Sequence, residues 1–311
     1  FPLPGPARLA HEGLGSLRGA ELQKKIALLE AFQQDDLDRE LRARALALSA
    51  GNPRLLERLN KVLADATLDT DAILAAMEKA TEEFREDILL RELLARQTAD
   101  GRQLLARLSV YGLPVDRVAV EAVAATSNIE SHLARAAALS LVEMEQSPAD
   151  GQGRYFISGI LGPLLVMTDE ERLEANRRGA HHLHQTLWAA GKGLSPEWAL
   201  EIHRLAMMAK EKEMAASVGD ALASAWVNQS RYREAEALCA RTLSLGGDYR
   251  IHHTLARAEG VLGKAGDARR HYEEALAHCP SEEVRLHAAI IHNLAGVIAQ
   301  QGDVKRALDL W

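Results

Sequence analysis

The segment LARAEGVLGKAGDARRHYEEALAHCP, residues 255–280, predicts how the larger part of this chain folds. Two helical stretches meet at a Leu-Gly pair, with Ala256 on the first and Ala268 on the second. Tyr272 follows one helical turn after Ala268, and Pro280 closes the segment. Small residues let two helices approach closely, an aromatic ring fills the space beside them, and proline cannot continue a helix. The segment therefore predicts a hairpin of two packed helices.

The same spacing of twelve residues between two alanines recurs on both sides of this hairpin. The alanine pairs are Ala223 with Ala235, Ala256 with Ala268, and Ala295 with Ala307. The large residues four positions after the second alanine are Cys239, Tyr272 and Trp311, and a weaker unit ahead of them contains Ala199 and His203. Successive second-helix alanines lie 36, 33 and 39 residues apart, close to the roughly 34 residues of the tetratricopeptide repeat, which these units resemble. We expect an irregular array of helical hairpins.

Stacked hairpins of this kind present a concave face lined by their first helices, and such faces bind peptides, helices or neighbouring domains. The residues expected on that face are Trp226, Asn228, His252, Arg257, His292 and Asn293. We predict that they bind a protein or peptide partner. For each of them, a solvated helix face or a packing role is the alternative.

Residues 20–65 are expected to form three helices, with Leu22, Ile26, Leu29 and Phe32 on one face at helical spacing. This part also contains a corner between two of the predicted helices. Gly51 can end one helix, Asn52 can cap the next, and Pro53 suits its first turn. The apolar stripe that follows is formed by Leu55, Leu56, Leu59, Val62 and Leu63. As a plain helix-turn-helix corner, this feature requires no function.

Residues 98–158 predict three helices followed by a β-hairpin. The helices are expected within residues 98–111, 114–123 and 128–138, and the strands within residues 141–145 and 153–157. The connection between the strands, Ser147-Pro148-Ala149-Asp150-Gly151, is rich in turn-forming residues. Three helices followed by a hairpin is the order of a winged-helix domain.

In this order the units resemble the rear half of a STAND-type signal-transduction ATPase. The resemblance rests on the corner GNPRLL (residues 51–56), the stretch LLARLSVYGLPVDRVAVEAV (residues 104–123), the hairpin and the repeats. It implies a mainly α fold with a helical lid-like subdomain at 1–80, a winged-helix-like domain at 81–168 and a tetratricopeptide-like α-solenoid at 169–311. It also implies a regulatory role, in which a partner on the array alters how the lid and winged helix hold a nucleotide-binding core that this chain lacks.

The resemblance further implies a nucleotide contact in the longer protein. In the family, a Gly-x-Pro corner of the lid touches the adenine of ATP or ADP, which gives Gly51 and Pro53 that role when the core is present. A histidine just after the hairpin, in a Met-His-Asp-like triplet, reaches the phosphate. The matching segment here is Ile157-Ser158-Gly159, which departs from the pattern. We expect no cofactor to bind this chain by itself.

The sequence lacks motifs for chemistry. It has no GxxxxGK[ST] phosphate loop, because Gly191-Lys192-Gly193 and Gly263-Lys264-Ala265 precede neither Ser nor Thr. It also lacks a Gly-x-Ser-x-Gly elbow and a His-Glu-x-x-His helix. The histidines of the segment His181-His182-Leu183-His184 have no evident partner ligands, so no metal site is expected. We therefore predict no catalytic centre in this chain, and ATPase activity only in a longer parent protein.

Two alternatives remain. The first is a transcription regulator whose winged helix binds DNA, although residues 99–158 carry five arginines against seven acidic side chains, a poor surface for phosphates. The second is a free-standing repeat scaffold with an unrelated helical N-terminus.

Composition fits an all-helical protein without an extended nucleic-acid surface. The chain is 47% hydrophobic but only 4% aromatic, and 37 basic against 44 acidic side chains give a net charge of −7. Cys239 and Cys279 lack the spacing of a disulfide framework, and no apolar run could span a membrane, so a cytoplasmic location is expected. The ends at Phe1 and Trp311 suggest a piece of a longer polypeptide, for which oligomers are conceivable.

Overall fold

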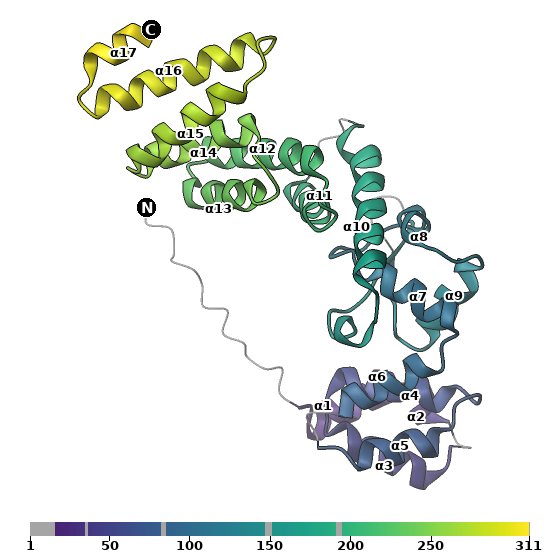
Figure 1. Cartoon of the computed structure of the whole chain (residues 1–311). Helices are drawn as coiled ribbons and strands as arrows, with labels where there is room; N and C mark the ends of the chain where they lie inside the picture. The colour runs from purple at the N-terminus through teal and green to yellow at the C-terminus, as the bar shows by residue number, and fades with distance from the viewer. Residues whose placement is uncertain (1–15, 35–36, 82–84, 147–150, 191–194, 311) are drawn as a thin grey trace. The chain divides into compact units, whose positions relative to one another are not determined.

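A computed structural model describes residues 16–34, 37–81, 85–146, 151–190 and 195–310 of the 311-residue chain (Figure 1). Three features of the sequence lie outside the described residues. They are Trp311, the turn residues 147–150 and the segment Gly191-Lys192-Gly193.

The described residues are mainly α-helical, as the sequence predicts. The helices before the hairpin are α1 (Gly19–Ala27), α2 (Glu30–Gln33), α3 (Arg39–Ser49), α4 (Pro53–Ala64), α5 (Thr70–Glu78), α6 (Arg85–Ala95), α7 (Ala99–Leu108), α8 (Arg117–Val123) and α9 (Ile129–Ala138). The hairpin consists of β1 (Glu143–Gln146) and β2 (Gly153–Phe156), followed by a 3-10 turn at Gly162–Leu164. The remaining helices are α10 (Asp169–Leu183), a π-helical turn at His184–Trp188, α11 (Pro196–Met208), α12 (Lys212–Asn228), α13 (Tyr232–Leu243), α14 (Tyr249–Val261), α15 (Ala265–His278), α16 (Val284–Gln300) and α17 (Val304–Leu310).

The chain divides into two compact units, each built from three separate segments. The first takes in Phe1–Leu105, Thr126–Met144 and Ile157–Leu165, and the second takes in Ala106–Ala125, Glu145–Phe156 and Val166–Trp311. The repeat array thus belongs to the same unit as residues 106–125 and most of the hairpin.

The first unit is organised around the amphipathic helix α4. Asn52 caps this helix, because its Oδ1 accepts from the backbone N–H groups of Arg54 (3.0 Å) and Leu55 (3.2 Å). Leu56 and Leu59 are fully buried on its inner face, whereas Leu63 at its end is only half-buried. The predicted corner and its apolar stripe are confirmed, apart from that partial exposure.

The prediction of three helices within residues 20–65 is wrong by one. The chain breaks between α1 and α2, since Leu29 takes an extended conformation (φ −102°, ψ 103°) before Glu30 starts a short second helix. Ile26, Leu29 and Phe32 are nevertheless all buried. The helical spacing of these apolar residues predicts one continuous helix. The structure has two helices instead, and the break between them leaves the same side chains facing inward.

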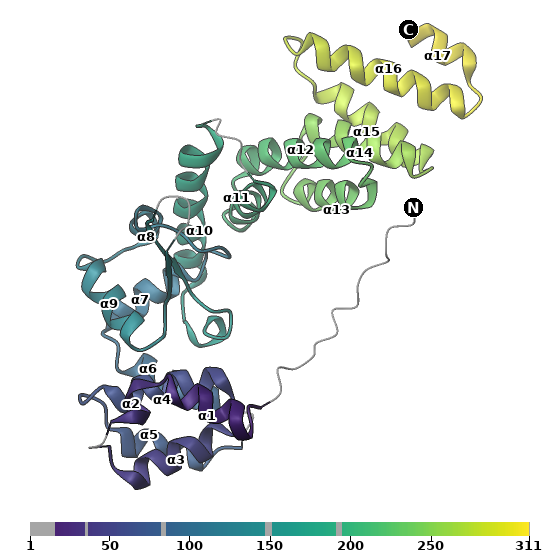
Figure 2. The ribbon, with the colours of Figure 1, turned by 180° about the vertical axis from the view of Figure 1, so that it is seen from behind.

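The hairpins of the second unit stack side by side (Figures 1 and 2). We call α12, α14 and α16 the first helices of the array and α13, α15 and α17 the second helices. Helix α12 contacts α14, and α14 contacts α16, while each first helix also contacts the second helix that follows it. This nearest-neighbour pattern is typical of a solenoid.

All six alanines of the predicted pairs are buried. Ala223, Ala235, Ala256, Ala268 and Ala295 are wholly inaccessible and Ala307 is 5% exposed. The residues four positions after the second alanine, Cys239 and Tyr272, are buried too, as are Ala199 and His203 of the weaker unit. The structure thus confirms the packing that the spacing of twelve predicts.

Each hairpin turn ends its helix in the same way. The second residue after the helix has positive φ at Lys210 (58°), Ser230 (62°), Gly263 (78°) and Gly302 (94°). The following N–H then donates to a carbonyl five residues back, as in the bond from Lys264 to Glu259 (2.9 Å). This is the Schellman end of a helix, and it explains the glycine of the Leu-Gly pair at residue 263.

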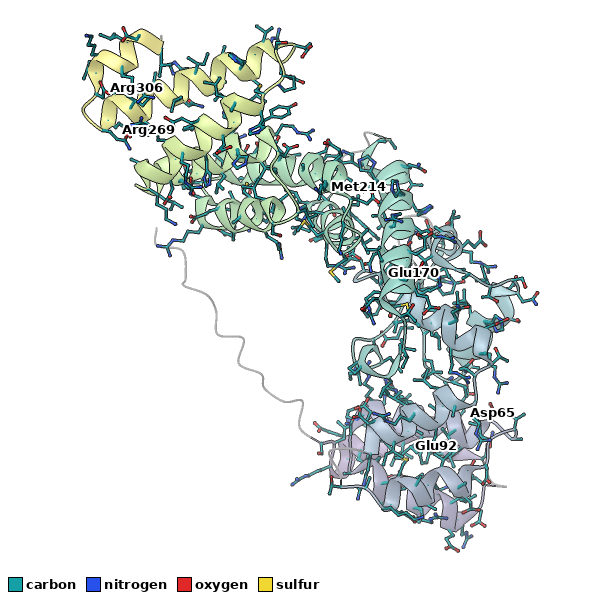
Figure 3. The ribbon with its side chains drawn as sticks, in the orientation of Figure 1. Asp65, Glu92, Glu170, Met214, Arg269 and Arg306 are labelled. Atoms are coloured by element: carbon teal, nitrogen blue, oxygen red, sulfur yellow. The ribbon has the colours of Figure 1, made fainter. Side chains whose placement is uncertain are left out.

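Paired charges fix the outer edges of the hairpins. Glu273 of α15 accepts from Arg269 on the same helix (3.0 Å) and lies 3.6 Å from Arg306 of α17 (Figure 3). Both arginines are partly exposed, so these pairs contribute little to stability and mainly fix local geometry.

Helices α10 and α11, which precede the first helix of the array, contact the turn after α7. Glu201 of α11 is 5% exposed, and its carboxylate accepts from the backbone N–H of Gly112 at 2.7 Å. Arg204 donates to both oxygens of Glu201 and to the carbonyl of Val110. Gly179 of α10 lies against the ring of Tyr111. The positions of residues 110–112 are therefore fixed by contacts with α10 and α11.

Close packing at Ala268 leads to the first prediction. The substitution Ala268→Leu should lower the free energy of unfolding by about 1–3 kcal/mol, because the added atoms have no space between α14 and α15. Urea unfolding followed by circular dichroism measures this change. Ala277→Leu on the exposed side of the same helix is the control and should change the free energy little. Equal effects of the two substitutions would contradict the packing.

The buried imidazole of His203 leads to the second prediction. His203 is 2% exposed, and its Nε2 donates to Thr242 Oγ1 at 2.8 Å, since that hydroxyl itself donates to Leu238. Burial, helped by the charge of Arg241, lowers the pKa of His203 to about 4. Between pH 6.5 and 4 the unfolded chain therefore binds a proton that the folded chain does not, and stability falls as the pH falls.

Lowering the pH from 7 to 5 should therefore cost the folded chain about 2 kcal/mol through His203 alone. Urea unfolding at both pH values should show a smaller loss for His203→Gln than for the unsubstituted chain. His278→Gln, at an exposed position, should leave the loss unchanged. An unaltered pH dependence in His203→Gln would show that this imidazole is not the group responsible.

Candidate functional site

The described part of the array contains a groove of about 570 Å³ that crosses its three first helices. Four of the six predicted partner residues line this array groove, namely Asn228 of α12, Arg257 of α14, and His292 and Asn293 of α16. The structure therefore brings together residues that lie up to 65 positions apart in the sequence.

Six of the twelve lining residues lie at fixed positions relative to the buried alanines of the first helices. Asn228, Val261 and Gln300 each lie five positions after the buried alanine of their first helix. Arg257 and Gly296 each lie one position after it, and His292 three positions before it. Positions four apart share one face of a helix. Counting from the alanines would have found Val261, Gly296 and Gln300, which the sequence-based prediction missed.

Arg257 and Asn293 are held at the array groove by contacts with neighbouring helices. Arg257 donates to Oδ1 of Asn228 at 3.3 Å, and Asn293 Nδ2 lies 3.3 Å from Nε2 of His253. Burial, with the nearby charge of Arg257, lowers the pKa of His253 to about 4, so its ring is neutral and Nε2 can accept. The amides of α12 and α16 thus lie on either side of a positive charge on α14.

Two tyrosines from the second helices complete the lining. Tyr232 of α13 is half-buried, and Tyr272 of α15 is 4% exposed. Burial raises the pKa of Tyr272 to about 12, so its hydroxyl stays neutral. With Val227 and Val297, these rings give the array groove an apolar wall.

The other two predicted partner residues lie outside the array groove. The ring of His252 lies 5.5 Å from that of His271, whose Nδ1 is 2.7 Å from Glu259 Oε2. Burial and His271 lower the pKa of His252. Trp226 is half-buried, with the guanidinium of Arg231 4.8 Å above its ring. His253, the neighbour of His252 on the next helical position, is the histidine that contacts a groove residue.

The corner at Gly51 is tightly built. Gly51 has a φ of 77°, and its surroundings leave no room for a side chain, because a Cβ there would lie 2.4 Å from the carbonyl oxygen of Leu17. The backbone N–H of Leu17 donates to the Gly51 carbonyl at 2.8 Å. Pro53 occupies the first turn of α4 and is half-buried. Gly51 is therefore explained by packing within the first unit, whatever else the corner contacts.

Two arginines follow the corner, and one of them, Arg54, connects it to the hairpin and to the segment after the hairpin. Arg54 donates to Ser158 Oγ and to Glu143 Oε1 (3.2 Å). Arg58, only 3% exposed, is paired with Glu86, and burial lowers its pKa. The two segments that the family resemblance links to nucleotide, the corner and Ile157-Ser158-Gly159, are thus joined through Arg54. Sequence reasoning missed both arginines, although Arg54 stands next to Pro53.

The histidine cluster of α10 shows no metal-like arrangement. His181 Nε2 lies 3.6 Å from Glu211, and His184 stacks on Trp188 with ring centroids 6.3 Å apart. Among the residues that the structure describes, no group of three or more His, Cys, Asp or Glu side chains could hold a metal ion. Cys239 and Cys279 are free thiols. Within the same described ranges, no helix combines the length and apolarity that crossing a bilayer requires.

Comparison with known proteins was made at the level of sequence and of structure. No family model and no curated protein matches the sequence. One solved structure matches the fold. It is that of a Signal Transduction ATPase with Numerous Domains (STAND) protein with a tetratricopeptide repeat sensor from Pyrococcus horikoshii, with a TM-score of 0.63 at 14% identity.

The match covers 94% of this chain but only 40% of the length of the Pyrococcus protein. At that identity it concerns the fold alone. It includes both compact units, since no alignment of the array by itself could cover so much of the chain. The chain is therefore a mainly α protein with a tetratricopeptide-like α-solenoid, and its fold is related to that of a STAND protein.

The corner leads to the third prediction. Gly51→Ala should lower the free energy of unfolding by more than 2 kcal/mol, of which roughly 1–2 kcal/mol reflects the left-handed backbone and the rest the clash with Leu17. Gly19→Ala is a matched control, because Gly19 also has positive φ (53°) but a Cβ there meets nothing within 4 Å. Thermal unfolding of both variants measures the difference. Equal losses would show that the approach of Leu17 does not constrain position 51.

Proposed function

We propose that this chain is the lid, winged-helix and repeat part of a STAND-type switch, whose array binds a protein or peptide partner. The observation that supports the proposal is the extent of the structural likeness, which covers 94% of this chain and so spans both compact units. A scaffold made of repeats alone would share only the array with a STAND protein. We therefore favour the switch over a free-standing scaffold.

The region between the lid and the array supports a winged-helix assignment. Helices α7, α8 and α9 precede the β1–β2 hairpin, and Val115 forms an isolated antiparallel bridge with Tyr155 of β2. The excess of acidic over basic side chains in residues 99–158 argues for a structural rather than a DNA-binding role. The contacts of Glu201 and Arg204 with residues 110–112 offer a route by which the array could act on this region.

In this proposal the switch is a two-state equilibrium biased by the partner. A partner can shift it only by binding one state more tightly than the other. Gly51 and Pro53 would contact the adenine of ATP or ADP only when a nucleotide-binding core is present. No catalytic role is assigned to residues of this chain, and a cytoplasmic location is proposed from its free thiols.

The fourth prediction concerns nucleotide. Titration of the 311-residue chain with MgATP or ADP by isothermal calorimetry should give no dissociation constant in the micromolar range, because the chain has no phosphate loop. Micromolar affinity would contradict the assignment. A second measurement is the DNA sequence of the gene upstream of the codon for Phe1. A phosphate-loop core encoded there would support the switch, and its absence from the whole gene would favour the scaffold.

A further inference from the structure

The array groove carries a distinctive distribution of charge. Arg257 is the one lining residue with a permanent charge, and no acidic side chain lines the groove among the residues that the structure describes. Other arginines of the array, such as Arg250 and Arg269, are paired with carboxylates at 2.8 and 3.0 Å. Within the described residues, the contact of Arg257 is with the neutral amide of Asn228. A guanidinium in this position favours a negatively charged occupant.

The acidic group near Arg257 is already engaged. Asp220 of α12 accepts from Thr254 Oγ1 at 2.6 Å, and Thr254 lies 3.2 Å from Ser224. Asp220 is not among the residues that line the groove. It therefore leaves the donors of Arg257 available on the groove side.

The neutral lining suits an extended peptide backbone. Asn228 and Asn293 lie on the two helices that flank α14, and a carboxamide can both donate to a carbonyl and accept from an N–H group. Neighbouring helices pack about 8–10 Å apart, so the distance from α12 to α16 is roughly 16–20 Å. An extended chain of about five or six residues covers that distance.

Two glycines open the groove to close approach. A Cβ added to Gly260 of α14 or to Gly296 of α16 would meet nothing within 4 Å. Neither has positive φ, and glycine inside a helix is less favourable than alanine. Neither backbone strain nor internal packing thus requires glycine at Gly296, in the middle of α16. Room for the backbone of another molecule is a reason for it.

We propose that the array groove binds an extended segment of a partner protein, with the carboxylate of an internal Asp or Glu side chain on Arg257. Because Arg257 lies on the middle helix of the three, its ligand occupies the middle of the segment and not a chain end. The inference rests on the proposed partner-binding function of the array and specifies the chemistry of that partner.

The test uses random octapeptides, flanked on both sides by Gly-Ser spacers and displayed on phage, selected on the immobilised 311-residue chain. Enriched peptides should contain a central Asp or Glu. A synthetic peptide so obtained should bind the Arg257→Ala variant at least about tenfold more weakly than it binds the unsubstituted chain. Fluorescence polarisation measures both dissociation constants. Replacing the peptide's Asp by Asn should weaken binding similarly on the unsubstituted chain and little further on Arg257→Ala.

Two variants of the chain make the result decisive. Gly296→Leu should block binding without unfolding the array, since its side chain enters open space. Arg270→Ala, on the exposed side of α15, should bind the peptide normally. The carboxylate inference would be overturned by enriched peptides that bind in the groove but lack an acidic residue. It would also be overturned by peptides that bind Arg257→Ala as tightly as the unsubstituted chain. Either result would leave the proposed partner binding of the array intact. No enrichment over an unrelated protein would overturn both.

Discussion

Each hairpin of the array depends on one close contact between two helices. Ala256 and Ala268 belong to a single buried cluster with Tyr272 and Ala295, so the contact in one hairpin also supports its neighbour. Alanine at these positions keeps the helices near enough for the ring of Tyr272 to fill the remaining space. The direction in which the first helices face follows from that contact, because a helix whose inner alanine is fixed has its other faces fixed as well. The array groove is a product of this constraint.

The array could be predicted from the sequence because its determinants are local. Two alanines twelve positions apart mark each hairpin, and the turn residue with positive φ is glycine at 263 and 302 but Ser230 in the hairpin of α12 and α13. The break between α1 and α2 could not be predicted, because Ile26, Leu29 and Phe32 keep a helical spacing across it. Periodicity reports which side chains face inward and does not report whether the backbone between them is continuous.

The candidate site was predicted in part, and the misses have two causes. His252 and His253 have the same side chain on adjacent positions, yet one lies beside His271 and the other beside Asn293. A rotation of about 100° per residue separates such neighbours, and only a reference point on the helix distinguishes them. The buried alanines provide that point. Arg54 was missed for another reason, since its link to Ser158 joins segments 104 positions apart and depends on the tertiary fold.

The division of the chain between its two units has a consequence for how this architecture can be altered. Each unit takes three stretches of polypeptide, and the backbone passes from one to the other five times. No single cut therefore separates the two units completely, because at least one side of any cut carries segments of both. Inheritance of the array without its companion unit would require rebuilding residues 106–125 and 145–156, which complete it. Such interleaving favours transmission of the whole assembly as one heritable block.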